Sequence, residues 1–189
     1  MSQRVALLDA NVLYPAPLRD LFLELAVAGL FQAKWSADIH QEWIVALLRN
    51  EPWRSRAALD RTRDLMDQAV RDCLVTDYAS LIPTLNLPDA GDRHVLAAAI
   101  VGRCEVIVTQ NLAHFPAAVL TPLGIAAQHP DAFLSTHLTL GPDDFCGAVR
   151  NVRARLVSPP YSVAEYLDSL SRQGLVATVC GLQPYASLL

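Results

Sequence analysis

The chain has 189 residues, with 15 Lys and Arg against 19 Asp and Glu, and 52% of its residues are hydrophobic. So few charges beside so many apolar residues exclude an intrinsically disordered chain, and the length suits one well-cored domain with a short appendage. The net charge of −4 argues against a protein that binds nucleic acid through a broad basic surface. A metal-dependent nuclease remains open, because its metal-binding acids themselves make the charge more negative.

Nothing near the start of the sequence predicts export or membrane insertion. Only four apolar residues, Val5 to Leu8, stand between a cation and an acid, which is too short for a signal peptide. The longest uncharged stretch, from Val106 to Pro130, is broken by prolines and polar residues and does not suit a membrane span. Four cysteines without a CxxC pair favour reduced thiols. We therefore expect a soluble, cytoplasmic protein without membrane contact.

The first part of the chain predicts a buried strand followed by helices. Val5 to Leu8 form an apolar run without alternation, as in a parallel strand covered on both faces. Apolar residues recur at helical spacing over residues 18–30, and Ser36 is placed as the N-cap of a second helix. A third helix is expected over residues 55–71, and residues 73–75 are a candidate strand.

The middle of the chain predicts another helix and another strand. An alanine-rich helix is expected from Asp92 to Ile100, and Val106 to Thr109 form a second buried apolar run. The alternation of strands and helices indicates an α/β fold with a parallel sheet. Asp9 and the pair 110–111 directly follow two of these strands. Because ligands bind beyond the carboxyl ends of strands in such sheets, we expect these positions to face one cleft.

The last part of the chain predicts only helices. They are expected over residues 131–138, 143–156 and 162–173, and the last begins with a capping-box pattern. A segment of about 50 residues rarely holds a core of its own. We therefore expect residues 1–137 to form the sheet domain and residues 138–189 to form a helical extension packed on it.

Four acids lie beside apolar elements rather than in charge-rich faces, namely Asp9, Glu42, Asp89 and Asp92. Acids gathered in one cleft repel one another unless cations bridge them, and oxygen-rich sites suit Mg²⁺ or Mn²⁺. Each acid also has an ordinary structural explanation, since Asp92 can cap its helix, Asp9 can cap a turn and Glu42 can be solvated. The four acids together indicate a metal site more specifically than any one of them does.

Four segments resemble, in order and spacing, the motifs of PIN-domain ribonucleases, and specifically of the VapC-type toxins of bacterial toxin–antitoxin pairs. The segments are Leu8-Asp9-Ala-Asn11-Val-Leu, Ser36-Ala-Asp-Ile39-His-Gln-Glu42, Pro88-Asp89-Ala-Gly-Asp92-Arg-His-Val-Leu-Ala-Ala-Ala and Val108-Thr109-Gln-Asn111-Leu-Ala-His-Phe115-Pro116. The resemblance covers about residues 4 to 137, and the helical tail resembles the C-terminal extension of one branch of these toxins. It implies a PIN-like parallel sheet flanked by helices, with a short helical C-terminal appendage.

The resemblance also implies roles for the acids. Asp9, Glu42 and Asp92 are the implied catalytic residues and hold a divalent metal ion, Mg²⁺ or Mn²⁺, with Asp89 nearby as an auxiliary metal-site acid. The fourth acidic position of the family is here Asn111, which accepts hydrogen bonds but contributes no charge.

Further polar residues in these motifs have two interpretations each. His114 stands where many relatives have another acid, and it is either a ligand or proton shuttle or a solvated surface histidine. Asn11 and Thr109 either orient the metal ligands or are ordinary turn residues. Arg93 is the arginine best placed to bind substrate. Six arginines and five acids between residues 49 and 72 favour a solvated helix with ion pairs over an RNA groove.

The implied reaction is hydrolysis of an RNA phosphodiester by a metal-activated water. The implied partners are RNA, a small VapB-like antitoxin whose segment blocks the cleft, and a second copy in a homodimer. One alternative is a catalytically weakened PIN scaffold that binds RNA or protein, motivated by Asn111 and His114. Another is a haloacid-dehalogenase-like phosphatase, which would also place Asp9 after a first strand but normally has a second acid where Asn11 stands.

Overall fold

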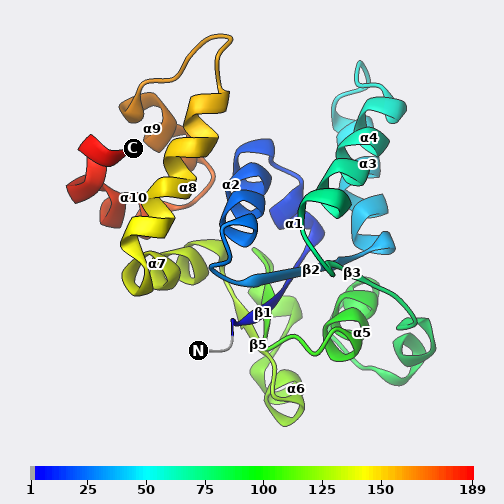
Figure 1. Cartoon of the computed structure of the whole chain (residues 1–189). Coiled ribbons are helices and arrows are strands. Elements are labelled where there is room, and N and C mark those ends of the chain that lie inside the picture. Colours follow the sequence, from blue (N-terminus) through cyan, green and yellow to red (C-terminus); the bar gives the residue numbers. More distant parts are fainter. Residues whose placement is uncertain (1–2) are drawn as a thin grey trace.

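A five-stranded parallel sheet forms the centre of the protein, as seen in a computed structural model that describes residues 3–189 (Figure 1). Every pair of neighbouring strands runs parallel. The predicted α/β fold with a parallel sheet flanked by helices is therefore confirmed. The strands, in the order in which they lie side by side, are β3 (Leu74–Val75), β2 (Gln32–Ser36), β1 (Val5–Leu8), β4 (Val106–Val108) and β5 (Ala126–Gln128).

The central strand β1 explains why the sheet could be predicted from apolar runs. Leu7 pairs with Lys34 of β2 on one side and with Ile107 of β4 on the other. The side chains of Leu7 and Leu8 are fully buried although they point to opposite faces of the sheet. A strand covered on both faces needs apolar residues at successive positions, and β1 and β4 have them.

Sequence reasoning did not predict β2 or β5. β2 alternates an exposed Gln32 and a half-buried Lys34 with the buried Ala33 and Trp35, so it contains no apolar run. Its Lys34 ammonium donates a hydrogen bond to the carbonyl of Asp72, which lies just before β3. β5 lies at the edge of the sheet and is built from two alanines and a glutamine, which are weak strand formers.

The predicted helices are present with small shifts at their ends. The largest shift is in α2, which stops at Val27 rather than at residue 30, because Gly29 adopts a left-handed φ of +82°. The short helices α1 and α6 and the helix α10 were not predicted. In the described residues the α-helices are α1 (Ala10–Leu13), α2 (Ala16–Val27), α3 (Ala37–Asn50), α4 (Arg56–Ala69), α5 (Arg93–Val101), α6 (Ala117–Leu120), α7 (Pro130–Leu140), α8 (Pro142–Arg155), α9 (Val163–Arg172) and α10 (Val176–Leu182).

Within residues 3–189, no helix combines the length and the apolar character needed to cross a bilayer. All four cysteines are free. Burial raises the pKa of the Cys73 thiol to about 11 and that of Cys104 to about 12, which makes these two thiols poor nucleophiles.

The C-terminal helices share a core with the sheet domain. α2 and α3 lie on one side of the sheet and α5 on the other, while α8, α9 and α10 stack beyond α2 (Figure 1). Phe133 of α7 stacks on Phe22 of α2 at 5.9 Å between ring centroids and meets Phe31 edge-on at 5.0 Å. α7 runs continuously through residue 137, and the division of the chain between residues 137 and 138 stays a prediction.

Asp131 at the start of α7 fixes the position of α10. Its carboxylate accepts hydrogen bonds from the backbone N–H groups of Ala177 and Thr178, both at 2.8 Å, and from the Thr178 hydroxyl at 2.7 Å. These N–H groups belong to the first turn of α10, where a helix has no internal partners for them. Asp131 therefore acts as an N-cap for a helix more than 40 residues away in sequence.

We expect Asp131→Ala to lower the free energy of unfolding by about 2 kcal/mol, because it leaves the first turn of α10 without its charged acceptor. Urea denaturation measures the loss. Asp144→Ala is the matched control, since Asp144 is an exposed acid in the first turn of α8. We expect the control to lose less than about 1 kcal/mol. Equal losses in the two variants would contradict the capping role of Asp131.

Candidate active site

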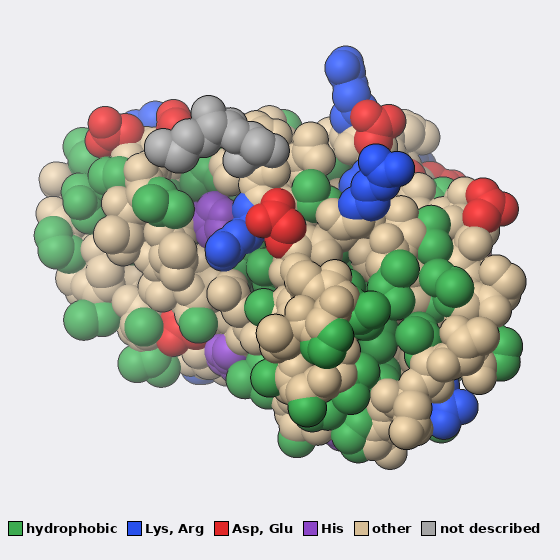
Figure 2. Space-filling model, turned by 90° about the horizontal axis from the view of Figure 1, so that it is seen from below, with side chains coloured by type: hydrophobic (Ala, Val, Ile, Leu, Met, Phe, Trp, Pro, Cys, Tyr) green, Lys and Arg blue, Asp and Glu red, His purple; other side chains and the backbone are tan. Residues whose placement is uncertain are grey.

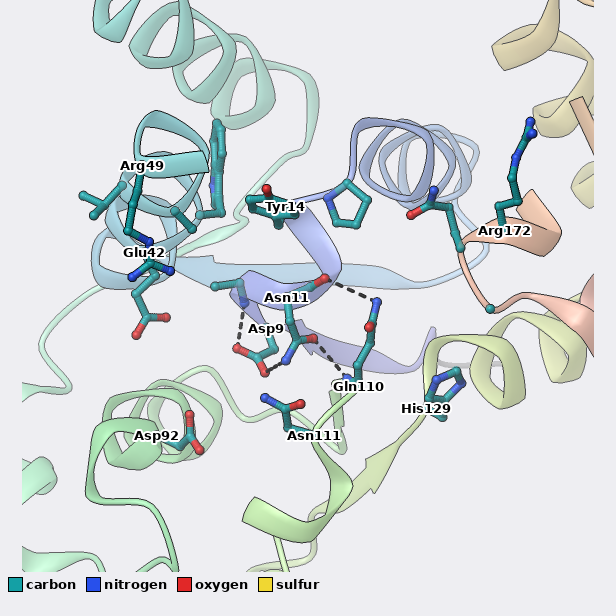
Figure 3. A pocket seen from close by; sticks show the side chains of 17 residues that line it. Asp9, Asn11, Tyr14, Glu42, Arg49, Asp92, Gln110, Asn111, His129 and Arg172 are labelled. Atoms are coloured by element: carbon teal, nitrogen blue, oxygen red, sulfur yellow. Dashed lines mark hydrogen bonds between the residues drawn. The ribbon is translucent and has the colours of Figure 1, made fainter. Parts of the chain in front are cut away.

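A cleft of about 810 Å³ lies beyond the carboxyl ends of β1 and β4 (Figure 3). Asp9 directly follows β1, Asn111 follows β4, Glu42 projects from α3 and Asp92 precedes α5. Five of the predicted site residues line this cleft, namely Asp9, Asn11, Glu42, Asp92 and Asn111. The topology thus brings together acids that are more than 80 residues apart in sequence.

Asp9 lies on the floor of the cleft and is only 4% exposed. Its Oδ2 accepts a hydrogen bond from the Thr109 hydroxyl at 2.6 Å and another from Asn11 Nδ2 at 2.6 Å. Its Oδ1 accepts a third from the backbone N–H of Ala10 at 2.7 Å, so Asp9 also caps α1. Both oxygens are therefore oriented by fixed donors.

The electrostatics of the cleft oppose ionisation of Asp9. Burial is the largest cause and raises the pKa of its carboxyl. The hydrogen bonds from Thr109 and Ala10 lower this pKa, and the negative charges of Asp92 and Glu42 raise it again, with a net upward shift. A cation in the cleft would remove the repulsion and favour the ionised form.

Thr109 and Asn11 both contact Asp9 and also each other. The fully buried Thr109 hydroxyl accepts hydrogen bonds from Asn11 Nδ2 and from the backbone N–H of Asn111, both at 3.0 Å. Asn11 Oδ1 accepts a hydrogen bond from the backbone N–H of Gln110 at 3.0 Å. These bonds join the ends of β1 and β4 around the carboxylate. The role of Asn11 and Thr109 in orienting a metal ligand stays a prediction.

Glu42 has a partner that the sequence analysis did not single out. Ser36 caps α3 by accepting a hydrogen bond from the backbone N–H of Ile39 at 3.2 Å, which sets the helix so that Glu42 lines the cleft. The carboxylate of Glu42, 45% exposed, lies 2.9 Å from Nε2 of His94 in α5. The side chain of His94 is 11% exposed. His94 follows Arg93 in the third motif, and its contact with Glu42 is the observation that marks it as part of the site.

The pKa of His94 is raised. Burial is the largest single influence and lowers it, but the hydrogen bond from His94 to Glu42 and the charges of Glu42, Asp38 and Asp9 together outweigh burial. The folded protein therefore binds this proton more tightly than the unfolded chain. The pair stabilises the fold at low pH, and its contribution is lost as the pH rises through the folded-state pKa of His94.

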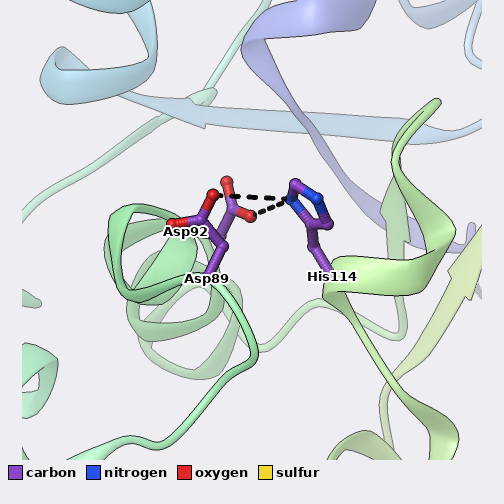
Figure 4. A group of neighbouring side chains, drawn as sticks. All are labelled: Asp89, Asp92 and His114. Carbon is purple, nitrogen blue, oxygen red and sulfur yellow. Dashed lines mark hydrogen bonds and ion pairs between the residues drawn. The ribbon is translucent and has the colours of Figure 1, made fainter.

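Asp92 does not use its side chain to cap α5, although it stands at the N-terminus of that helix. Its Oδ2 lies 2.6 Å from Nδ1 of His114, which is also 3.9 Å from Oδ2 of Asp89 (Figure 4). One ligand atom from each of these three residues falls within 4.8 Å of the others. Asp89 also accepts a hydrogen bond from the N–H of Gly91 at 2.8 Å. Asp89 and His114 are thus grouped with Asp92 but are not among the cleft-lining residues.

The predicted substrate-binding residue Arg93 does not line the cleft, and its Nε is buried without a hydrogen-bond partner among the described residues. Its contact with substrate stays a prediction. The arginine-rich helix α4 carries ion pairs such as Arg56 with Asp60 at 3.0 Å, which confirms the interpretation as a solvated helix. Sequence reasoning assigned no role at the cleft to three further lining residues, Arg49, His129 and Arg172.

A family model described as the PIN domain matches residues 5–113. The chain belongs to the PIN-domain family. A second model, described as the VapC50 C-terminal domain, matches residues 130–184 of this PIN-domain protein. The predicted resemblance to VapC-type PIN-domain proteins with a C-terminal extension is therefore confirmed.

The PIN-domain protein is also similar to a protein described as "Putative ribonuclease VapC50" from Mycobacterium tuberculosis (strain ATCC 25618 / H37Rv). The two are 42% identical over 96 residues, which is 51% of this chain and 56% of the relative. The aligned part therefore spans little more than half the length of that relative. No solved structure matches the chain.

We expect Thr109→Val to lower the free energy of unfolding by about 1 to 3 kcal/mol, because the backbone N–H of Asn111 loses its acceptor and the buried Asp9 loses a donor. We also expect the pKa of Asp9 to rise further, since the Thr109 hydrogen bond lowers it. Urea denaturation and carboxyl carbon NMR titration of the metal-free protein measure the two effects. The exposed Thr139→Val is the control; an unchanged Asp9 pKa in Thr109→Val would contradict the assignment.

We expect Glu42→Gln to lower the pKa of His94 in the metal-free protein. Burial of the imidazole lowers its pKa, and the charge of Glu42 is the main influence that raises it. Without that charge, burial shifts the equilibrium toward the neutral imidazole. NMR titration of the His94 ring protons reports the change. Glu51→Gln removes the same charge just beyond the C-terminal end of α3 and serves as the control. An equal shift in both variants would mean that general charge, and not the contact with Glu42, sets this pKa.

Proposed function

We propose that this PIN-domain protein is a metal-dependent endoribonuclease that acts as the toxin of a type II toxin–antitoxin system. One observation carries the proposal: Asp9, Glu42 and Asp92, from three separate elements, line one cleft, and within residues 3–189 no Lys or Arg forms an ion pair with any of them. Acids placed this way repel one another and need a cation. The printed name of the relative from M. tuberculosis, a putative ribonuclease, supports the same activity.

The residues present fit a divalent metal ion. The donors are carboxylate oxygens, which suit Mg²⁺ or Mn²⁺, and the repulsion from Asp92 and Glu42 that raises the pKa of Asp9 is the repulsion a cation would relieve. The three carboxylates are not within the 4.8 Å that groups Asp89, Asp92 and His114. Mg²⁺ usually keeps several waters and takes one or two carboxylates directly, so a looser set still fits. Asp9, Glu42 and Asp92 would hold the metal, with Asp89 as an auxiliary acid.

The proposed reaction is hydrolysis of an RNA phosphodiester, in which water attacks phosphorus and one P–O ester bond breaks in line with the attack. A bound divalent metal would supply Lewis acidity toward the phosphate and lower the pKa of the attacking water. The protein's own part is to position oxygens. Hydrogen bonds from Thr109 and Asn11 set the orientation of the Asp9 carboxylate. His94 of α5 contacts the Glu42 carboxylate at 2.9 Å and limits its movement.

The partners and compartment belong to the same proposal. We expect a small VapB-like antitoxin to inhibit the protein by placing a segment in the cleft, and we expect the toxin to act on RNA in the cytoplasm, either alone or as a homodimer. The match of residues 130–184 to the family model described as the VapC50 C-terminal domain supports the toxin assignment.

A second candidate function is a catalytically weakened PIN scaffold that binds RNA or protein. Two observations favour it: Asn111 places a neutral amide where the family often has an acid, and His114 occupies one oxygen of Asp92 at 2.6 Å. Both reduce the negative charge available to a metal. The two functions differ in whether purified protein cleaves RNA.

We expect purified, partner-free protein to cleave single-stranded RNA with Mn²⁺ or Mg²⁺, and EDTA to stop the cleavage. Asp9→Ala and Asp92→Asn should each lower the rate by about 100-fold or more, because each removes a charge from the metal site. Asp144→Asn, which removes an exposed charge from α8, is the matched control and should leave the rate unchanged. Gel analysis of a labelled RNA measures the rates.

Absence of any metal-dependent cleavage that Asp9→Ala or Asp92→Asn abolishes would reject the enzyme. RNA binding without cleavage would then support the weakened scaffold.

A further inference from the structure

The candidate cleft has a second wall, and this wall comes from the C-terminal extension. Arg172 at the end of α9 and the turn that follows it, Gln173 and Gly174, line the cleft together with His129, which precedes α7. In Figure 3, Arg172 and His129 lie on one side of Asp9 and Asn11, while Arg49 and Glu42 of α3 lie on the other. The cleft is therefore formed between the sheet domain and the extension.

The turn that carries Arg172 has a fixed conformation. Gly174 adopts a left-handed φ of +84°, and α9 ends in a Schellman motif in which the N–H of Gly174 bonds to Ser171 O at 2.9 Å and that of Leu175 to Leu170 O at 3.2 Å. The next helix, α10, is held by Asp131 of α7. The backbone at Arg172 is therefore anchored through α10 and α7 to the cluster of Phe22, Phe31 and Phe133.

The guanidinium of Arg172 is available to a ligand. It is 66% exposed, and its ion pair is with the equally exposed Asp168 at 3.2 Å, an i,i+4 pair on a solvated helix face. Such pairs contribute little free energy and are readily exchanged. Arg49, in the last turn of α3, is exposed and forms no ion pair within the described part of the chain. Two exposed cations, of which only Arg172 has an ion pair among the described residues, thus flank the acidic floor.

A chain of phosphates matches this arrangement of charges. A cation held by the acids would bind one phosphate of the chain. The guanidinium groups on either side of the acids offer paired N–H donors to the phosphates before and after it. On the face of the protein where α5 and α6 lie, Lys and Arg side chains are scattered among Asp and Glu side chains and do not merge into one continuous basic patch (Figure 2). The charge pattern therefore favours the cleft as the path of the backbone.

We propose that the C-terminal extension supplies a phosphate-binding wall of the RNA site, in which Arg172 and the opposing Arg49 contact backbone phosphates on the two sides of the scissile phosphodiester. This inference rests on the proposed function, since it takes the RNA substrate from there. The ligand is single-stranded RNA, whose backbone can follow the cleft and whose contacts here are independent of base sequence.

Fluorescence anisotropy of a labelled single-stranded RNA, with Mg²⁺ present, tests the inference. All variants carry Asp92→Asn so that cleavage does not interfere. We expect Arg172→Gln to weaken binding by about 3- to 10-fold and to reduce the slope of log K against log salt by about 0.7, the value for one phosphate contact on a single strand. Arg49→Gln should behave in the same way, and Arg172→Lys should retain most of the salt slope.

Arg150→Gln is the matched control, because Arg150 is an exposed arginine of α8 that does not line the cleft. It should leave both the affinity and the salt slope unchanged. Urea denaturation of Arg172→Gln verifies that the extension stays folded. Weakening of equal size in Arg150→Gln would overturn the inference, because it would mean that net charge alone sets the affinity.

Two further outcomes separate this inference from the proposed function. If Asp92→Asn abolishes cleavage but Arg172→Gln binds RNA with unchanged affinity and salt slope, the inference fails and the proposed function stands. If the protein neither binds nor cleaves RNA, both fail. Poly-L-glutamate serves as a probe for a protein carboxylate: if Arg172→Gln weakens binding of this polymer and not of RNA, the wall recognises an acidic protein and the inference is overturned.

Discussion

A buried carboxylate at the end of the central strand is the constraint on which the site depends. Asp9 is almost fully enclosed, yet it faces two other acids across the cleft. An ionised group in that position is costly unless donors and cations compensate it. The surrounding structure supplies part of the compensation through Thr109, Asn11 and the first turn of α1. In the proposed function, a divalent cation bound by the three acids supplies the remainder.

Much of the fold and the acidic half of the site could be predicted because both depend on local sequence. A strand buried on two faces requires an apolar run, and the cleft lies within three residues of its carboxyl end, at Asp9 after β1 and at Asn111 after β4. Ser36 and Ser162 cap their helices as their patterns indicated. The four motifs then identified the acids that line the cleft.

The other half of the site was not visible in the sequence because it depends on tertiary packing. β2 is a strand despite its polar residues, since its neighbours β1 and β3 supply the pairing. His94 is distinguished by its contact with Glu42, and Arg172 by the docking of α9 beside α2 and α10 beside α7. No local pattern encodes such a contact, because the two partners lie tens of residues apart and meet only after the core has formed.

The stacked rings of Phe22, Phe31 and Phe133 have a consequence for how the cleft can respond to a ligand. One wall of the cleft lies on α3, and the other follows α9 and is tied through α10 to α7, whose Phe133 packs against Phe22 and Phe31. Interiors of this density do not bend gradually. We therefore expect the two walls to keep a nearly fixed separation when a ligand binds in the cleft.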